Sequence, residues 1–174
     1  FKRQKDGEKI LLLGSYIELD TKYMLESIKG FDNVLFKSHP VVDIKRFGEL
    51  PKNITVSNDD IYKLFENSKL VIGTASGTSV EAVACGISVI IIASQDNLTL
   101  NPLVEYGQGK IWDIAFSKDN VKRLRNNLIE YRENNIEEIK DIASWYKDNF
   151  FIEPTEENIA RAFELHNTMD SIKK

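Results

Sequence analysis

Cysteine is almost missing from this chain, since Cys85 is the single one among 174 residues. A disulfide framework is therefore excluded, and a reducing compartment such as the cytoplasm is the environment to expect. No apolar run approaches the roughly 18 residues that a membrane-crossing helix needs, and residues 1–5 lack the apolar stretch of a signal peptide. The sequence thus predicts a chain without a transmembrane segment.

Positive charge is also in short supply, because 23 Lys and Arg stand against 27 Asp and Glu, for a net charge of -4. A nucleic-acid-binding protein normally carries a basic face, so we do not expect nucleic acid as a partner. The chain has no Walker P-loop, no GxGxxG fingerprint and no spacing typical of a metal site. We therefore predict no metal and no cofactor.

Hydrophobic side chains make up 42% of the sequence, which is enough for one good core in a chain of this length. We predict a single domain over residues 1–174, with closing helices over 117–168. The chain begins with Phe1 and not with Met, which favours a piece of a longer protein.

Apolar runs alternate with amphipathic segments along the chain. Strands are expected at 9–15, 33–37, 54–56, twice within 68–93, and at an edge position over 110–114. Helices are expected at 18–29, 59–67, in a short segment ending at Tyr106, and at 120–132, 136–149 and 155–166, the first of them capped by Asp20 or Thr21 and stopped by Gly30. This alternation predicts an α/β fold, a Rossmann-like open parallel sheet of about six strands with helices on both faces.

Residues 68–93 are the most informative part of the chain. Two buried strands bracket a polar turn and a small-residue helix that ends at Gly86. The first-turn amides of Thr78, Ser79 and Val80 are expected to have no intrahelical partner, and together with the helix dipole they favour a phosphate. The hydroxyls of Thr74, Ser76, Thr78 and Ser79 cluster there with Gly77, as in a phosphate cradle.

The same turn has an explanation without a ligand. Thr78 and Glu81 have the spacing of a capping box, and Gly77 permits a tight turn. Glu81 either closes that cap or turns its carboxylate toward ribose hydroxyls.

Ligands of open parallel sheets lie beyond the carboxyl ends of the strands. Small and polar residues gather at these positions: Gly14 and Ser15, Ser38 and His39, Ser57 and Asn58, Thr74 to Ser79, and Ser94 to Asn101. His39 is one of two histidines, precedes a proline, and is expected to contact a leaving phosphate. The other, His166, is expected to pack or lie at the surface. The amides between Gln95 and Asn101 suit sugar hydroxyls, although an ordinary solvated loop has a similar composition.

The motif Lys37-Ser-His-Pro40 and the segment 59–91, taken in that order, resemble the C-terminal, donor-binding half of GT-B glycosyltransferases. The His-Pro pair is similar to that of bacterial sialyltransferases and of the glycerol- or ribitol-phosphate polymerases of wall teichoic acid and capsule synthesis. Asn97 and Asn101, followed by Pro102 to Gly107, are similar to the sugar-binding loop of peptidoglycan N-acetylglucosaminyltransferases.

The resemblance implies a role for each of these residues. Ser76, Gly77, Thr78 and Ser79 would bind the donor phosphates, and Glu81 the ribose. His39 would be the catalytic residue that assists the leaving phosphate, by electrostatic stabilisation without a metal. Asn97 and Asn101 would face the donor sugar.

The resemblance further implies the nucleotide-sugar-binding half of a glycosyltransferase in bacterial surface polysaccharide or glycoconjugate synthesis. Its donor would be a UDP-, CDP- or CMP-linked sugar. The N-terminal acceptor-binding domain would lie outside this chain, which alone would bind nucleotide without turnover. The parent protein would be cytoplasmic, with a peripheral position at the inner membrane face as one arrangement.

Three alternatives stay open at this point. Two are enzymes: a CDP-polyol phosphotransferase and a sugar-nucleotide 2-epimerase. The third is a noncatalytic α/β binding or regulatory module in which the Ser/Gly turn is structural.

Overall fold

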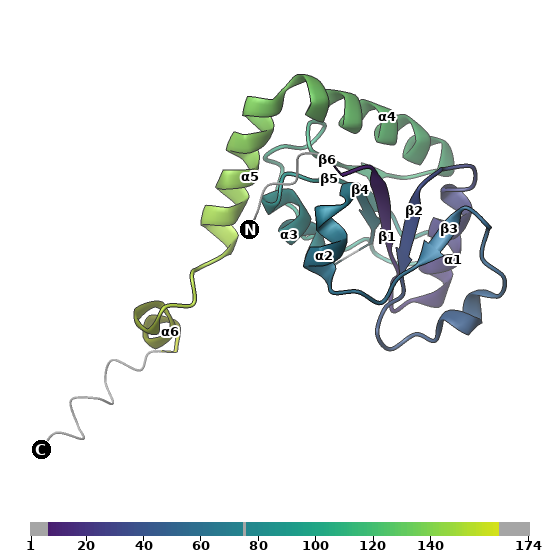
Figure 1. The fold of residues 1–174 in the computed structure, drawn as a ribbon, viewed down its shortest axis with the longest axis horizontal. Coiled ribbons are helices and arrows are strands. Elements are labelled where there is room, and N and C mark those ends of the chain that lie inside the picture. The colour runs from purple at the N-terminus through teal and green to yellow at the C-terminus, as the bar shows by residue number, and fades with distance from the viewer. Residues whose placement is uncertain (1–6, 75, 164–174) are drawn as a thin grey trace, which may run out of the picture.

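The computed structural model describes residues 7–74 and 76–163. Six parallel strands form one sheet in the order β3-β2-β1-β4-β5-β6, with helices on both faces (Figure 1). The predicted Rossmann-like open α/β sheet is confirmed.

Strands and helices alternate along the chain from β1 to β5, with a 3₁₀ turn in the place of a helix between β2 and β3. The strands are β1 (Lys9–Leu13), β2 (Val34–Lys37), β3 (Ile54–Val56), β4 (Ser68–Gly73), β5 (Ser88–Ile92) and β6 (Trp112–Ala115). The helices are α1 (Glu18–Ser27), α2 (Ile61–Glu66), α3 (Thr78–Ala84), α4 (Lys118–Asn134), α5 (Ile136–Phe150) and α6 (Glu156–Ala162), with a 3₁₀ turn η1 (Ile44–Phe47) between β2 and β3.

Alternating side chains of the central strands build one core on each side of the sheet. On β1, Ile10 and Leu12 pack on the side covered by α1 and α4, whereas Leu11 and Leu13 pack on the side of α2, α3 and α5. Both sides are apolar because a parallel sheet is covered on both faces. Full burial of one such side chain stabilises the fold by roughly 1.5–3 kcal/mol.

The strand order reverses direction between β1 and β4, since β2 and β3 follow β1 on one side and β5 and β6 follow β4 on the other. Such a switch point opens a crevice at the carboxyl ends of the strands, and ligands of this architecture bind there. The polar residues that follow β1, β2, β4 and β5 are therefore the ones that the fold brings to one edge.

The start of α1 differs from the sequence prediction. The N-cap is Ile17, and Asp20 and Thr21 lie inside the helix. Ser15 replaces a cap, because its Oγ accepts a hydrogen bond from the Ile17 amide and its own amide donates to Thr21 Oγ1 at 2.9 Å. The predicted capping role of Asp20 or Thr21 is wrong, whereas Gly30 follows the helix in the left-handed region (φ 84°), as expected of a stop.

The predicted short helix ending at Tyr106 is also wrong. Side chains of neighbouring elements hold this segment open: the Tyr146 hydroxyl lies 2.9 Å from the Val104 carbonyl oxygen and 3.0 Å from that of Tyr106. The indole of Trp112 donates to the same Tyr106 carbonyl at 3.1 Å. These bonds tie the segment to α5 and β6 in a non-helical course.

The last part of the chain is helical, as predicted. Helix α4 packs on the sheet and α5 packs on α3, whereas α6 has no buried residue and stands away from the sheet (Figure 1). Residues 164–166 of the predicted final helix, with His166, lie outside the described residues.

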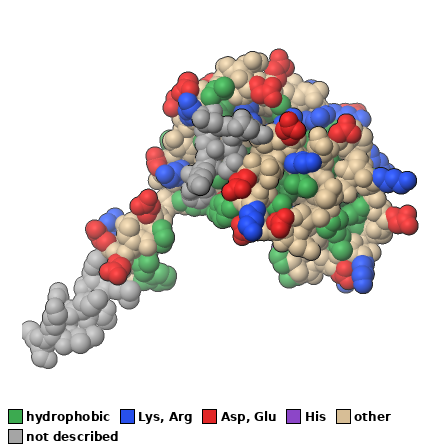
Figure 2. All heavy atoms as spheres, viewed as in Figure 1, with side chains coloured by type: hydrophobic (Ala, Val, Ile, Leu, Met, Phe, Trp, Pro, Cys, Tyr) green, Lys and Arg blue, Asp and Glu red, His purple; other side chains and the backbone are tan. Residues whose placement is uncertain are grey.

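Among the residues described, no helix combines the length and the apolar character needed to cross a bilayer. Acidic and basic side chains are interspersed on the face seen in Figure 2 and form no single basic field.

Candidate functional site

A cavity of about 220 Å³ lies where β1 and β2 end and α3 begins, and we name it the histidine cavity. Its lining comes from four separate parts of the chain: Leu13, Gly14, Lys37, Ser38, His39, Pro40, Ile61, Ser76 and Thr78. Three of the predicted site residues, His39, Ser76 and Thr78, therefore share one cavity although His39 lies more than 30 positions before the other two.

His39 is partly buried and is held by its own turn. The Val41 amide donates to His39 Nδ1 at 3.4 Å, and the Val42 amide donates to the His39 carbonyl at 2.9 Å. Because Nδ1 accepts, the neutral ring carries its proton on Nε2 and can donate it to a ligand oxygen. The Tyr16 ring lies edge-on to the imidazole, with centroids 6.1 Å apart.

Gly14 lets this turn approach the end of β1. A Cβ at this position would lie 3.1 Å from the His39 backbone nitrogen and 3.3 Å from Ser38 Cα. Both contacts are with backbone atoms, so relief requires movement of the turn itself. The glycine therefore sets the depth at which the imidazole sits.

The turn before α3 closes on itself more than the sequence predicts. The Thr78 amide donates to Ser76 Oγ at 3.3 Å, the Ser79 amide to the Ser76 carbonyl at 2.9 Å, and the Val80 amide to the Gly77 carbonyl at 2.9 Å. These amides were expected to have no intrahelical partner; those of Thr78 and Ser79 bond to Ser76, before the helix, and that of Val80 bonds to the N-cap residue Gly77, so all three are occupied within the chain. Tight bonds of this i to i+3 kind commonly satisfy the first turn of a helix.

The capping-box interpretation of Thr78 and Glu81 does not hold either. The N-cap is Gly77, without a side-chain cap, and Thr78 is the first helical residue. The Glu81 carboxylate interacts with α2 instead: burial first, then the charge and hydrogen bond of Glu81, raise the pKa of Tyr62. The hydroxyls of Ser76 and Thr78 thus remain in the cavity lining.

Gly77 and Ser79 take different places in this turn. Gly77 is exposed, has φ of -55°, and nothing lies within 4 Å of a Cβ built on it. Neither backbone conformation nor packing requires a glycine there. Ser79 is fully buried and does not line the cavity, and its Oγ has no hydrogen-bond partner among the described residues.

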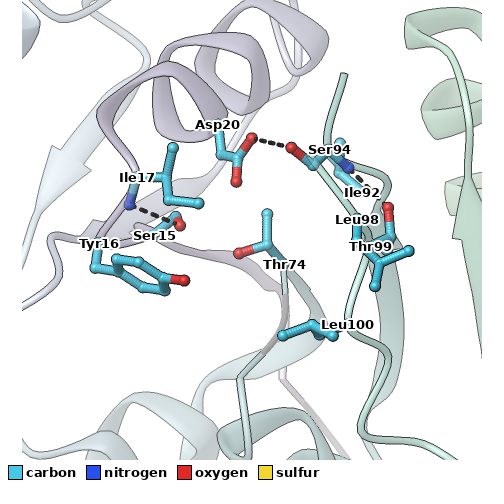
Figure 3. A pocket seen from close by; sticks show the side chains of 10 residues that line it. All are labelled: Ser15, Tyr16, Ile17, Asp20, Thr74, Ile92, Ser94, Leu98, Thr99 and Leu100. Carbon is cyan, nitrogen blue, oxygen red and sulfur yellow. Dashed lines mark hydrogen bonds between the residues drawn. The ribbon is translucent and has the colours of Figure 1, made fainter. Parts of the chain in front are cut away.

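A second, smaller pocket of about 30 Å³ lies at the strand-order reversal, and we name it the switch-point pocket (Figure 3). Ser94 Oγ donates to Asp20 at 2.8 Å, and the Ser94 amide donates to Thr99 Oγ1 at 3.0 Å. The Asp20 side chain thereby ties α1 to the loop after β5. The remaining lining is formed by Ser15, Tyr16, Ile17, Thr74, Ile92, Leu98 and Leu100.

The two asparagines predicted to face a sugar line neither cavity. Asn97 is exposed. Asn101 closes its own loop, since its Oδ1 accepts from the Leu103 amide at 3.0 Å and its Nδ2 donates to the Leu103 carbonyl at 2.9 Å. A sugar contact through these amides stays a prediction.

The polar residues after β3 also serve their own loop. The Ser57 hydroxyl donates to Asp59 Oδ2 at 3.0 Å and accepts from the Asp59 amide at 3.2 Å.

Within residues 7–74 and 76–163, no three His, Cys, Asp or Glu side chains come together in a way that could hold a metal ion.

Sequence reasoning missed Lys37, Tyr16 and Asp20 as lining residues. Lys37 is the last residue of β2, in register with Leu13 of β1. A signal existed, because Lys37 alternates with the buried Phe36 and shares a side of the strand with Leu35. Tyr16 and Asp20 could be recognised as lining residues only from the three-dimensional course of the chain into α1.

Comparison with solved structures yields proteins with similar folds. The glycosyltransferase SnogD from Streptomyces nogalater is 17% identical, matches 86% of this chain and 44% of its own length, and has a TM-score of 0.51. The wall teichoic acid polymerase TagF, in a histidine-to-asparagine variant soaked with CDPG, is 12% identical over 83% of this chain and 37% of TagF, with a TM-score of 0.52.

The UDP-GlcNAc 2-epimerase from Neisseria meningitidis, bound to UDP-GlcNAc, is 18% identical over 80% of this chain and 39% of the epimerase, with a TM-score of 0.52. The chain thus spans less than half the length of these proteins. No family model and no curated protein matches the sequence. At such identities the likeness concerns the fold: this chain has a Rossmann-like domain consistent with one half of a GT-B glycosyltransferase fold.

Proposed function

We propose that this chain is the donor-binding domain of a glycosyltransferase of bacterial surface polysaccharide or glycoconjugate synthesis, and that it binds a UDP-, CDP- or CMP-linked donor. One observation carries the proposal: an imidazole, an ammonium and two hydroxyls line the same cavity at the carboxyl edge of the sheet. Cations and hydroxyl donors in a shared recess suit phosphate oxygens. At about 220 Å³ the cavity is smaller than the roughly 300–1,000 Å³ of whole-ligand pockets, which suits the phosphate part of a donor.

In this proposal His39 is the catalytic residue. Its Nε2 donates to the departing phosphate, so that charge developing on the leaving group is stabilised by a preorganised donor. Ser76 and Thr78 contact the phosphates through their hydroxyls. A Cβ built on Gly77 would have no neighbouring atom within 4 Å, so a ligand has close access to the turn there.

Other roles require present contacts to break on binding. Glu81 would release Tyr62 in order to reach a ribose, and Asn101 would give up its bonds to Leu103 in order to face a sugar. Asn97 is exposed and needs no such change. Ser79 would have to leave its buried position to reach a phosphate.

The acceptor site and general base would come from a partner domain, the N-terminal half of the parent enzyme. The domain by itself would bind nucleotide without turnover. We further propose that the parent acts without a metal, on the cytoplasmic side, at the inner membrane face.

A nucleotide panel tests the proposal directly. At one hundred times its Kd, a bound nucleotide stabilises the domain by about 2.7 kcal/mol, which raises the melting temperature by roughly 5–10 °C. We expect this shift with one of UDP, CDP, CMP or GDP, and a smaller one in His39→Gln. Absence of a shift with all four would favour a noncatalytic α/β module.

The base preference separates the enzymatic alternatives. The likeness to TagF, soaked with CDPG, favours a CDP-polyol phosphotransferase as a second candidate. Preference for a cytidine nucleotide would support that reading, whereas preference for UDP would support a glycosyltransferase or a 2-epimerase. Conversion of UDP-GlcNAc into its C2 epimer, UDP-N-acetylmannosamine, by the parent protein without any acceptor would single out the epimerase.

A further inference from the structure

A groove beside α1 lies apart from the carboxyl edge of the sheet, and we name it the α1 groove. Its volume is about 260 Å³. A face of α1 and the turn after it form one wall, and the segment between η1 and β3 forms the other: Lys22, Leu25, Glu26 and Lys29, then Phe47, Glu49, Leu50 and Pro51. Leu25 is buried, and Phe47 and Leu50 pack against the same core. The floor of the groove is therefore apolar.

The rim of the α1 groove carries a cation without an ion-pair partner. Lys22 is paired with Glu18 at 2.5 Å. Glu26 is paired with Lys118. No carboxylate of the described chain lies within 4 Å of the Lys29 ammonium. An occupant of this groove should bring an acidic group to Lys29 and apolar side chains to the floor.

Helix α6 presents such a set of side chains. Ile159 and Phe163 are four residues apart on one helix face, and they are 42% and 72% exposed. Glu156 lies on the same face, three residues before Ile159. No cation of the described chain lies within 4 Å of the Glu156 carboxylate, whereas Glu157 is paired with Arg161 at 3.2 Å. The helix thus combines an unpaired acid with an unpartnered apolar stripe.

Helix α6 lies far from the α1 groove of its own copy. It follows α5, which packs on α3, on the side of the sheet opposite to α1. Figure 1 shows α6 at the other end of the molecule from α1 and β3. The linker of residues 151–155 is short, since five residues span at most about 18 Å. A contact between α6 and the groove therefore joins two copies.

We propose that the α1 groove binds α6 of a second copy of this chain, with Glu156 at Lys29 and with Ile159 and Phe163 on the apolar floor. An amphipathic helix in an apolar groove is a recurring mode of recognition. The seven residues of α6 are about 10 Å long, which matches the stretch of α1 wall from Lys22 to Lys29. One short helix covers less than the about 800 Å² per partner of a standard interface, so the association is weak and depends on concentration. The inference is independent of the proposed function.

Charge reversal on each side tests the contact by sedimentation velocity. The wild type should associate increasingly as its concentration rises. Glu156→Lys and Lys29→Glu should each weaken this association at least tenfold, because like charges then meet. An equimolar mixture of the two variants should associate again, because Glu156 of one variant meets Lys29 of the other. Glu157→Lys and Lys52→Glu, which reverse exposed charges outside the contact, are the matched controls and should associate as the wild type does.

Three results would overturn the inference. The first is a wild type that stays monomeric up to about 1 mM, which excludes even a millimolar Kd. The second is association that Lys29→Glu leaves intact while Ile159→Asp removes it, because α6 would then bind another surface. The third is a mixture of Glu156→Lys and Lys29→Glu that stays monomeric, because the two charges would then not meet between copies. Circular dichroism of each variant verifies that the helix content is that of the wild type.

Discussion

The histidine cavity and the switch-point pocket lie at the same edge of the sheet, yet they use their polar side chains differently. In the switch-point pocket, Asp20 and Thr99 both bond to Ser94, and only about 30 Å³ is left open. In the histidine cavity, Lys37 and His39 each make one bond to backbone, and about 220 Å³ is open. The first set of groups holds loops together, whereas the second retains capacity for a ligand.

The comparison teaches that polar composition at a strand end does not by itself identify a binding site. Groups that satisfy one another contribute to stability, and a ligand would have to displace those bonds. Groups with unused donors and space in front of them contribute little to the free fold. Substitutions in the two regions should therefore separate stability from affinity.

The largest effect is expected for Asp20→Ala, which breaks the bond between α1 and the loop after β5. Hydrogen bonds to a charged group contribute roughly 1.5–3 kcal/mol, so the free energy of unfolding should fall by about that amount in urea titrations. Asp20→Asn retains an acceptor for Ser94 and should lose less. A tenfold loss of nucleotide affinity with unchanged stability would instead place the ligand in the switch-point pocket.

Gly14→Ala should come next. The added Cβ would meet the His39 backbone nitrogen at 3.1 Å, and such overpacking costs about 1–3 kcal/mol while it displaces the histidine turn. Gly73→Ala is a matched control at the same sheet edge, because its Cβ would meet its nearest neighbour at an ordinary 3.6 Å. Equal unfolding midpoints for the two variants would contradict the close-approach account of Gly14.

The double substitution Ser76→Ala and Thr78→Ala decides between cavity lining and helix capping. We expect about a tenfold loss of nucleotide affinity, or about 1.4 kcal/mol, with a stability change below about 0.5 kcal/mol, because the bond lost from the fold is the long 3.3 Å one from the Thr78 amide to Ser76 Oγ. Calorimetry and urea unfolding measure the two quantities on the same sample. If stability falls by about 1 kcal/mol and affinity is retained, the hydroxyls act as caps.

Gly77→Ala should have the smallest effect. The free fold offers open space and a helical φ at this residue, so stability should stay within about 0.5 kcal/mol of the wild type. A methyl group facing the ligand should weaken nucleotide binding about threefold, or roughly 0.7 kcal/mol. A stability loss above about 1 kcal/mol would mean that the turn itself needs the glycine.

The sheet could be predicted from the sequence almost strand by strand, because runs such as Ile10 to Leu13 and Val89 to Ile92 are buried on both faces. Their continuous apolar character is a local property of the chain. The convergence of His39 with Ser76 and Thr78 followed from topology, since carboxyl ends of parallel strands share one edge.

The details that failed depend on partners distant in sequence. Tyr146 and Trp112 anchor the non-helical segment near Tyr106 through its carbonyl oxygen, and neither residue is visible to a local propensity argument. Thr21 serves Ser15, six residues earlier, instead of capping α1. Whether the amides near Ser79 are free depends on how tightly the first turn of α3 winds. The hydroxyl and glycine content of the segment does not determine this winding.

An NMR titration tests the central claim that the histidine cavity, and not the switch-point pocket, holds the anionic ligand. Assigned amide spectra would be followed while the best nucleoside diphosphate of the panel is added. Saturable shifts are predicted at His39, Ser76 and Thr78, with Asp20 and Ser94 unmoved. Shifts centred on Asp20 and Ser94, or no saturable shift at all, would contradict the account.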